Sequence, residues 1–161
     1  MKILILTFFS ILSLISCSNN DDDDISVPNN NSNLVPINIT PILIGNGVLY
    51  GDGAEGIIQS NVVISDSIQW QNLLNQMNSI NNVSNSFSEI SIDFTQYQII
   101  AVFDNIYGDA GHNISISSII ENVNNINVTV QSVYVINVFA IQTQPYYIVK
   151  IPKSTKPVIF Q

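Results

Sequence analysis

The chain of 161 residues has no arginine, one histidine and one cysteine, and its 4 lysines are set against 12 acidic residues. Proteins that bind nucleic acid need basic groups to neutralise phosphates, so a chain with a net charge of −8 is not expected to do so. The same shortage argues against binding to anionic headgroups. A lone cysteine cannot form an internal disulfide, so the folded part must be stable without one.

The sequence is also poor in the residues and motifs that most catalytic and metal sites require. Zinc sites prefer several His or Cys ligands. A Ser/His/Asp triad would have to use His112, which we interpret as a structural or surface histidine. There is no Gly-X-Ser-X-Gly motif, and Gly51-Asp52-Gly53 is not followed by the Gly-Lys-Ser/Thr of a phosphate loop. We therefore expect a protein that is not an enzyme and that holds no cofactor or metal.

Carboxylates are the remaining resource for chemistry. Asp52 and Glu55 lie in a glycine-rich stretch, and a second group comprises Asp104, Asn105 and Asp109. Either group could offer oxygen ligands to calcium, which takes six to eight of them, but neither has the spacing of an EF-hand. Turn and loop roles explain the same residues and are the favoured interpretation. A glycosidase-like carboxylate pair has no motif behind it.

The first residues have the zones of a secretory signal peptide. Lys2 supplies the positive charge, and an apolar stretch from Ile3 to Leu14 follows. About a dozen residues suit a signal-peptide core and are too few to span a hydrocarbon layer, which takes roughly 20. The tetrad Leu14-Ile15-Ser16-Cys17 resembles a lipobox. It predicts that residues 1–16 are removed and that Cys17 becomes lipidated, with a plain signal peptide and an incidental cysteine as the alternative.

Residues 17–36 are predicted to be a flexible tether. They contain a run of acids from Asp21 to Asp24 and then an Asn/Pro/Ser-rich stretch, which offers few apolar side chains to bury. Acidic residues just after a lipidated cysteine resemble the surface-export signal of some Gram-negative lipoproteins. A simple spacer and a weak cation-binding tract are the alternatives. We expect an outer-membrane lipid anchor exposed at the cell surface, with a periplasm-facing anchor as the alternative.

Residues 37–161 are predicted to form a single globular domain with one helix at about 66–80. Asp66 is a plausible N-cap, and Gln69 three residues later completes the pattern of a capping box. Ile80 extends the apolar stripe of this helix, and the Asn residues that follow are a reasonable stop. The apolar residues at i, i+3, i+4 and i+7 are Trp70, Leu73, Leu74 and Met77.

The rest of the domain is predicted to be β-structure. Ile99–Phe103 is continuously apolar, which suits a strand buried on both faces, and the other strands alternate. Alternation favours antiparallel strands, and the long helical gaps that parallel crossovers need are absent. The fold class is therefore α+β: a mostly antiparallel sheet or small sandwich with one packed helix. Strands are expected at 42–44, 48–50, 57–58, 62–64, 98–104, 114–116, 128–130, 133–141, 146–151 and 156–160, turns at 45–47, 51–53 and 122–125, and a loop at 83–96.

Several pieces between residues 92 and 160 follow the pattern of one protein family. They are Ile92-Asp93-Phe94 before a buried strand, Gly111-His112 opening another, and above all Gln142–Pro152, which holds Thr-X-Pro-Tyr before a strand ending Ile-Pro. In these pieces the chain resembles the C-terminal domain of the protease complex subunit PrcB family, in which a tryptophan-containing helix precedes the domain. The family has Gly-Gly-Tyr where this chain has Ala110-Gly111-His112. The resemblance implies a lipoprotein that associates with an exported protease and stabilises it.

Candidate surface residues complete the sequence-based picture. Tyr146 and Tyr147 are neighbours on a strand, so one can pack in the core while the other lies at the surface. With Asp109 and His112 they form a candidate partner surface, because tyrosine is enriched in interfaces; stabilisation of the sheet by both tyrosines is the alternative. Asp66-Ser67-Ile68 resembles a bacterial O-glycosylation acceptor centred on Ser67. The predicted function is a membrane-anchored accessory or binding module for an exported protein, with a surface glycan- or ligand-binding lipoprotein as the alternative.

Overall fold

The structure is a computed structural model that describes residues 36–136 and 139–161. A single α-helix, α1 (Ser67–Met77), and a short 3₁₀ helix, η1 (Val83–Ser86), accompany the strands in this part of the chain. The strands are β1 (Ile37–Asn38), β2 (Ile42–Leu49), β3 (Ser60–Ile64), β4 (Tyr97–Phe103), β5 (His112–Glu121), β6 (Ile126–Tyr134), β7 (Gln144–Pro152) and β8 (Val158–Phe160).

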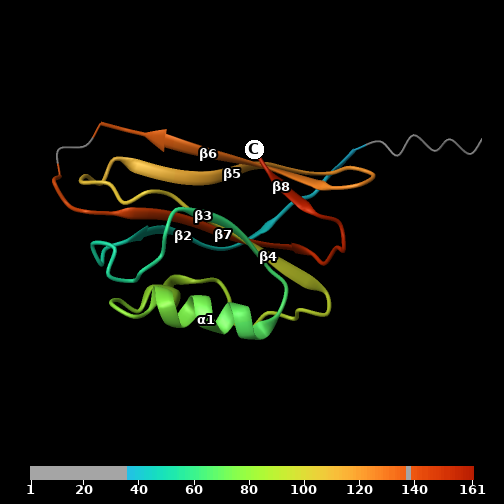
Figure 1. Cartoon of the computed structure of the whole chain (residues 1–161), viewed down its shortest axis with the longest axis horizontal. Helices are drawn as coiled ribbons and strands as arrows, with labels where there is room; N and C mark the ends of the chain where they lie inside the picture. The colour runs from blue at the N-terminus through green and yellow to red at the C-terminus, as the bar shows by residue number, and fades with distance from the viewer. Residues whose placement is uncertain (1–35, 137–138) are drawn as a thin grey trace, which may run out of the picture. The chain divides into compact units, whose positions relative to one another are not determined.

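The strands form two four-stranded sheets, with the orders β1-β5-β6-β8 and β2-β7-β4-β3. Neighbouring strands are antiparallel except for β6 and β8, which are parallel. The chain passes from β6 to β8 through β7 in the other sheet, so a strand supplies the crossover that parallel neighbours require. The predicted class is confirmed: a mostly antiparallel α+β sandwich with one packed helix, arranged in three layers (Figure 1).

The sheet β2-β7-β4-β3 is the middle layer, and its central strands β4 and β7 are buried on both faces. In β4, Ile99, Ala101 and Phe103 pack into the core shared with α1, whereas Ile100 and Val102 pack into the core between the two sheets. Successive side chains of a strand point to opposite faces, so a strand between two apolar layers must be apolar at every position. The continuous run at residues 99–103 therefore has the predicted position.

Helix α1 begins as the sequence predicts. The Asp66 carboxylate accepts hydrogen bonds from the backbone N–H groups of Ile68 at 3.0 Å and Gln69 at 2.9 Å. The Gln69 side chain accepts from the N–H of Ser65 at 3.4 Å, one residue before the position that a full capping box uses. The side chains that the helix buries are Trp70, Leu74 and Met77.

The helix ends at Met77, earlier than the predicted 80. Asn78 closes it by donating its backbone N–H to Leu74 O, and its side-chain amide donates to the Ser84 hydroxyl at 2.8 Å. These bonds turn the chain into η1, so Ile80 lies outside the helix with 51% of its surface exposed. The expected extension of the apolar stripe to Ile80 is wrong.

The predicted turn at Gly45-Asn46-Gly47 is wrong, because β2 runs through it as one strand paired with β7. Gly45 lies directly beneath the Phe87 ring, so glycine here permits a close approach of that ring. The next predicted turn is present: Asp52 has a φ of 52° and Gly53 a φ of 83°. Glycine thus marks a packing contact in the first case and a backbone turn in the second.

Three other expectations about strands need correction. The run at 133–141 is not one strand: β6 stops at Tyr134, because that residue pairs with His112, where the partner strand β5 begins. Residues 57–58 belong to no strand, and the last strand covers only Val158–Phe160. The two-residue strand β1, which pairs with β5, was not predicted.

The predicted signal peptide, Cys17 and most of the predicted tether lie outside the described residues. Within residues 36–136 and 139–161, no helix is long and apolar enough to cross a membrane.

Candidate partner-binding tip

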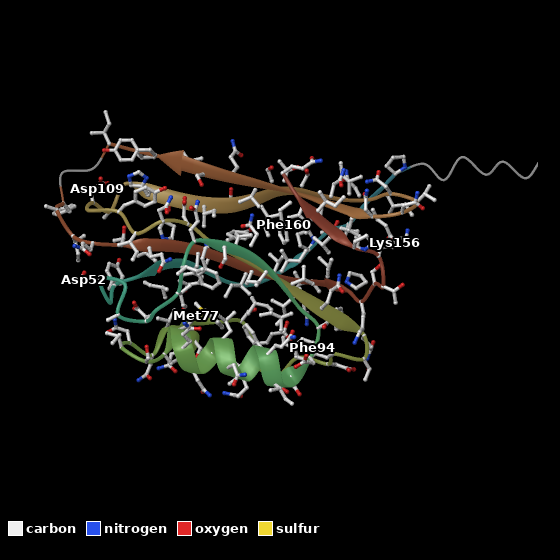
Figure 2. The ribbon with its side chains drawn as sticks, viewed as in Figure 1. Asp52, Met77, Phe94, Asp109, Lys156 and Phe160 are labelled. Atoms are coloured by element: carbon white, nitrogen blue, oxygen red, sulfur yellow. The ribbon has the colours of Figure 1, made fainter. Side chains whose placement is uncertain are left out.

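Three connections between strands meet at one end of the domain: β2–β3, β4–β5 and β6–β7. The register places them together, because β2 ends opposite Gln144, β4 ends opposite Tyr146 and β6 ends opposite His112. We call this end the distal tip. β1, close to the first described residue, pairs with the Glu121 end of β5, so the length of β5 separates it from the tip, about 30 Å. Figure 2 shows Asp52 and Asp109 at the tip and Lys156 at the other end.

The distal tip exposes large apolar side chains. Ile136 is 86% exposed and Phe139 is 70% exposed. The backbone N–H of Val135 donates to Gly111 O at 2.8 Å, which joins the chain after β6 to the β4–β5 connection. A hollow of about 380 Å³ in this tip is lined by Tyr50, Ala110, Phe139, Ala140 and Ile141. The exposed apolar residues of the tip are Tyr50, Ile106, Tyr134, Val135, Ile136, Phe139 and Ile141.

The buried Asp104 carboxylate holds the tip together. One oxygen accepts from the N–H of Asn105 at 2.8 Å and from the Tyr107 hydroxyl at 3.0 Å, with the Gln59 amide at 3.5 Å. The other oxygen accepts from the Ser132 hydroxyl at 2.7 Å. These donors come from the β2–β3 connection, the β4–β5 connection and β6. Asp104 therefore has the loop role that the sequence analysis favoured over calcium binding.

His112 lies between two tyrosine rings. Its ring stacks on Tyr107, with centroids 3.4 Å apart, and lies 4.6 Å from the ring of Tyr134 on β6. Its Nε2 is 3.6 Å from the Asp109 carboxylate. In the part of the chain that the structure describes, no serine or threonine hydroxyl hydrogen-bonds to His112, so its contacts there are those of a packing residue.

The other predicted carboxylate pair is used inside its own loop. Glu55 is buried, and its carboxylate folds back over Gly51. It accepts a hydrogen bond from the backbone N–H of Gly51 at 2.9 Å. This bond closes the turn that Asp52 and Gly53 form. Among the described residues, no three His, Cys, Asp or Glu side chains gather as a metal-binding group.

The two predicted surface tyrosines do face opposite sides of β7, but neither is well exposed. Tyr146 is 3% exposed and lies between the rings of Phe87, at 6.1 Å, and Phe103, at 6.4 Å. Tyr147 is half-buried and packs on the core between the sheets. The tyrosines that the tip exposes are Tyr50 and Tyr134, which the sequence analysis did not single out. The available signal was the apolar run that begins at 133, which was interpreted as a strand.

Ser67, the candidate glycosylation site, is exposed at the first residue of α1. The Asp66 side chain beside it is the helix N-cap, so its carboxylate is held by the two N–H groups of the first turn. The acceptor-like triplet therefore coincides with a helix start.

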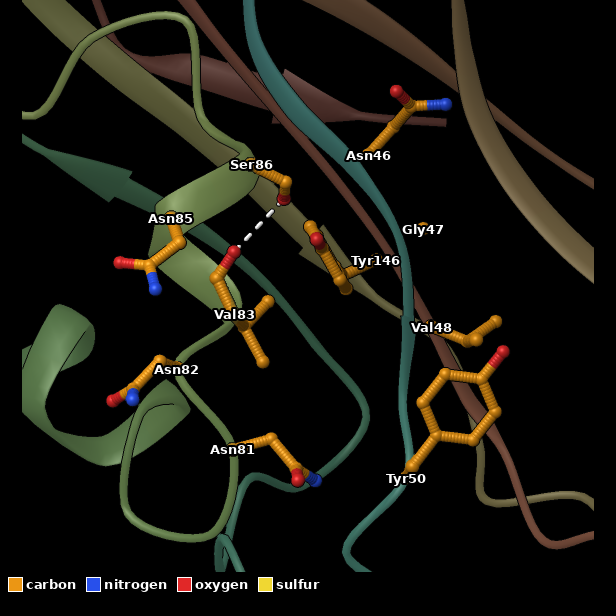
Figure 3. A pocket seen from close by; sticks show the side chains of 10 residues that line it. All are labelled: Asn46, Gly47, Val48, Tyr50, Asn81, Asn82, Val83, Asn85, Ser86 and Tyr146. Carbon is orange, nitrogen blue, oxygen red and sulfur yellow. Dashed lines mark hydrogen bonds between the residues drawn. The ribbon is translucent and has the colours of Figure 1, made fainter.

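A second hollow lies beside the edge strand β2 (Figure 3). It is a groove of about 690 Å³ between β2 and the segment that contains η1. Its lining residues are Asn46, Gly47, Val48, Tyr50, Asn81, Asn82, Val83, Asn85, Ser86 and Tyr146. Sequence reasoning missed it, because the sequence analysis assigns the asparagines that follow the helix only to a helix stop.

No family model matches the chain, and comparisons with curated proteins and with solved structures give no match either. The resemblance of residues 92–160 to the PrcB family therefore remains a prediction.

Proposed function

We propose that this chain is a lipid-anchored, non-enzymatic accessory lipoprotein that binds an exported protein through its distal tip. The anchor is Cys17 and the tether is residues 17–36, as the sequence predicts. The observation that carries the proposal is the gathering of exposed apolar side chains on three connections at one end of the sandwich. Large contiguous apolar patches on soluble domains commonly mark interaction sites.

The position of the tip suits a tethered protein. The described chain starts near the end opposite the tip, which we call the base, so the proposed anchor joins the domain about 30 Å from the tip, the length of β5. The roughly twenty residues of the tether can span at most about 70 Å. A tether of that length would let the tip reach a partner beyond the surface of the bilayer that holds the lipid.

The charges around the domain favour a protein partner over an anionic one. The three described lysines are all engaged away from the tip: Lys150 with Glu89 at 2.5 Å, Lys156 with Glu121 at 2.8 Å, and Lys153 with the Phe94 carbonyl at 2.6 Å. The tip itself carries acidic side chains such as Asp52 and Asp109. Phosphate-rich partners would find no cation there, whereas tyrosine and phenylalanine are enriched in protein interfaces.

The resemblance to the PrcB family makes an exported protease the first partner to test. The alternative function, binding of a surface glycan or another ligand, is favoured by a different feature, the asparagine-lined groove beside β2.

Photo-crosslinking from the tip tests the proposal directly. Benzoylphenylalanine would replace Ile136 in the full chain in native membranes, and Val123, an exposed apolar residue in the β5–β6 turn at the base, would be the matched control position. We expect a single exported protein to crosslink from position 136 and not from position 123. Mass spectrometry would identify it, and Cys17→Ser would show which contacts need the anchor.

Two results would count against the proposal. Equal crosslinking from both positions, or crosslinking only to lipid, would remove the tip as a protein-binding site. Recovery of a stoichiometric partner that is not a protease would keep the binding role and reject the protease. A second pair, Val135→Asp and Val123→Asp, separates loss of binding from a general effect of a surface charge, because both valines are exposed.

A further inference from the structure

We propose that an extended segment of the exported partner adds to the free edge of β5 as an extra strand, in line with β1. This inference rests on the function proposed above and specifies how the partner is held. The free edge is the side of β5 that faces away from β6 at residues 112–116. It begins at the tip, where His112 opens the strand, and runs toward β1 at the base.

The backbone groups of the free edge have no partner strand. On the β6 side, Gly111 O accepts from Val135 N–H at 2.8 Å. Successive residues of a strand point their N–H and C=O groups to alternate sides. The residues whose groups point away from β6 are therefore His112, Ile114 and Ile116. β1 reaches only residues 119–121, and within the described residues no other group hydrogen-bonds to these N–H and C=O groups.

Such a row of donors and acceptors selects another extended chain. N–H groups two residues apart on a strand recur about every 7 Å, and each is accompanied by a C=O group, which is the pattern of an extended backbone. The free edge carries neither the lysine nor the proline that commonly blocks strand addition, and the bulge of β5 lies beyond it, between Ile116 and Ser118. The outer edge of β2, by contrast, is partly covered, because Ser88 N–H donates to Ile44 O at 2.8 Å.

The other sheet extends beneath the free edge. β5 packs on β7, and β2 lies beside β7 at the edge of its sheet. The link at residues 39–41 joins β1 directly to β2, so these two strands lie on the same side of the sandwich. A hollow of about 310 Å³, lined by this link and by residues 116–119 of β5, marks the point where the chain leaves the line of β1. Beyond that point, β2 has no strand of the other sheet above it.

The side chains of β2 that face the other sheet are accordingly exposed. Leu43 is 42% exposed, although the register pairs it with the buried Val149. Asn46 is exposed and pairs with Tyr147, which is only half-buried although β7 is a central strand. Figure 3 shows Asn46 and Val48 on the side of β2 away from η1. Because this uncovered face is neutral and partly apolar, we expect the added strand to point uncharged, mainly apolar side chains toward it.

A single strand fits this position, whereas the edge of a second copy does not. β2 extends one strand farther out than β5 of the same copy. If β5 paired with β5 of another copy, the two β2 strands would collide. An extended segment of a partner has no such projection. The free edge also starts at the tip, so a protein bound to the exposed apolar side chains there can continue along β5.

Hydrogen exchange of single amides tests the added strand. The tagged full chain would be isolated from native membranes together with the protein identified by crosslinking from position 136, and exchange would be measured by mass spectrometry with electron-transfer fragmentation. We expect the N–H groups of Ile114 and Ile116 to exchange at least about tenfold more slowly in the complex than in the free chain. Those of Asn113 and Ser115 point toward β6, so their exchange should change little and serves as the internal control.

A charge beneath the added strand should weaken the complex. Leu43→Glu places a carboxylate on the uncovered face of β2, where the added strand would bury it. Ile42→Glu is the matched control, because its neighbouring position is 48% exposed on the opposite face of the same strand. We expect Leu43→Glu to lower recovery of the partner about tenfold, and Ile42→Glu to leave it unchanged. Thermal unfolding like that of the parent would show that both variants are folded.

Failure of this inference and failure of the proposed function are distinguishable. Crosslinking from position 136 with unchanged exchange at Ile114 and Ile116 would keep the tip as a binding site and overturn the added strand. Recovery of the partner by Leu43→Glu at the level of Ile42→Glu would do the same. The absence of any protein crosslinked from position 136 would overturn both proposals.

The other possible occupants of the free edge give different results. Slow exchange of Ile114 and Ile116 in the chain alone, abolished by deletion of residues 18–35, would assign the edge to the chain's own tether. Slow exchange that depends on the concentration of the chain alone would assign it to a second copy. Either result overturns the proposal.

Discussion

The ring of His112 lies flat on the ring of Tyr107, with the centroids 3.4 Å apart and the planes within 1° of each other. Tyr107 is further held by its hydroxyl, which donates to the Asp104 carboxylate at 3.0 Å. His112, the only histidine of the chain, is the first residue of β5. Through Tyr107 it is connected to the Asp104 carboxylate in the tip. This arrangement ties the start of β5 to the β4–β5 connection beside the exposed apolar side chains of the tip.

Removing the imidazole should loosen the tip without unfolding the domain. We expect His112→Ala to lower the free energy of unfolding by about 1 kcal/mol, the size of a lost aromatic pair. His112→Phe keeps a ring in the stack and should recover most of that loss. Urea denaturation measures both variants. If His112→Ala and His112→Phe lose the same amount, ring stacking is not what the histidine contributes.

The hydroxyl of Tyr107 should resist ionisation. Burial, followed by the hydrogen bond to Asp104, raises the pKa of Tyr107 above its usual 10.0. Because the pKa of Tyr107 is higher in the folded state than in the unfolded state, its protonated hydroxyl contributes to stability. That contribution is complete below the unfolded pKa of about 10 and is lost as the pH rises through the folded pKa. Asp104→Asn removes the negative charge, so it should lower the pKa of Tyr107.

Absorbance titration of tyrosinate checks this expectation. The signal of Tyr107 is obtained by subtracting the titration of Tyr107→Phe from that of the parent, and in the same way in the Asp104→Asn background. A Tyr107 signal at the same pH with and without the Asp104 charge would show that the carboxylate does not control the ionisation.

Gly45 should be intolerant of even one added methyl group. A Cβ at this position would collide with the Phe87 ring, which is wedged between Trp70 and Tyr146. We expect Gly45→Ala to cost about 1–3 kcal/mol of stability, as overpacking does. Gly108→Ala is the matched control, because a Cβ there meets nothing within 4 Å. Calorimetry of the two variants should show a lower melting temperature for Gly45→Ala alone.

The start of α1 allows capping and glycosylation to be separated. Asn caps a helix about as well as Asp, so Asp66→Asn should leave stability nearly unchanged, whereas Asp66→Ala should cost about 1 kcal/mol. Asp66→Asn nevertheless destroys the Asp-Ser-Ile triplet. If Ser67 carries a sugar, Asp66→Asn and Ser67→Ala should both lose the mass of that sugar, in addition to the mass change of each substitution. A parent mass without added sugar would reject the modification.

Local patterns were informative wherever the structure depends on neighbouring residues. The Asp66 cap, the helix stripe from Trp70 to Met77 and the buried strand at 99–103 all follow from periodicity and capping, which act over a few residues. The turn predicted from the glycines at 45 and 47 was wrong, because Gly45 contacts Phe87, a residue far from it in the chain. The strand predicted at 133–141 was wrong for the same reason, because the end of β6 depends on where its partner β5 begins.

The sequence by itself determined the α+β class, the position of the helix, most of the strands and the acidic character of the domain, because these depend on composition and short-range patterns. The prediction of a lipid anchor at Cys17 also comes from the sequence alone. Only the tertiary structure brought Tyr50, Ile106 and Phe139 to one tip, and Asn46 and Asn82 to one groove. These residues are distant in the chain, and they meet because strand pairing and the packing of three layers place their connections at the same end or edge of the sandwich.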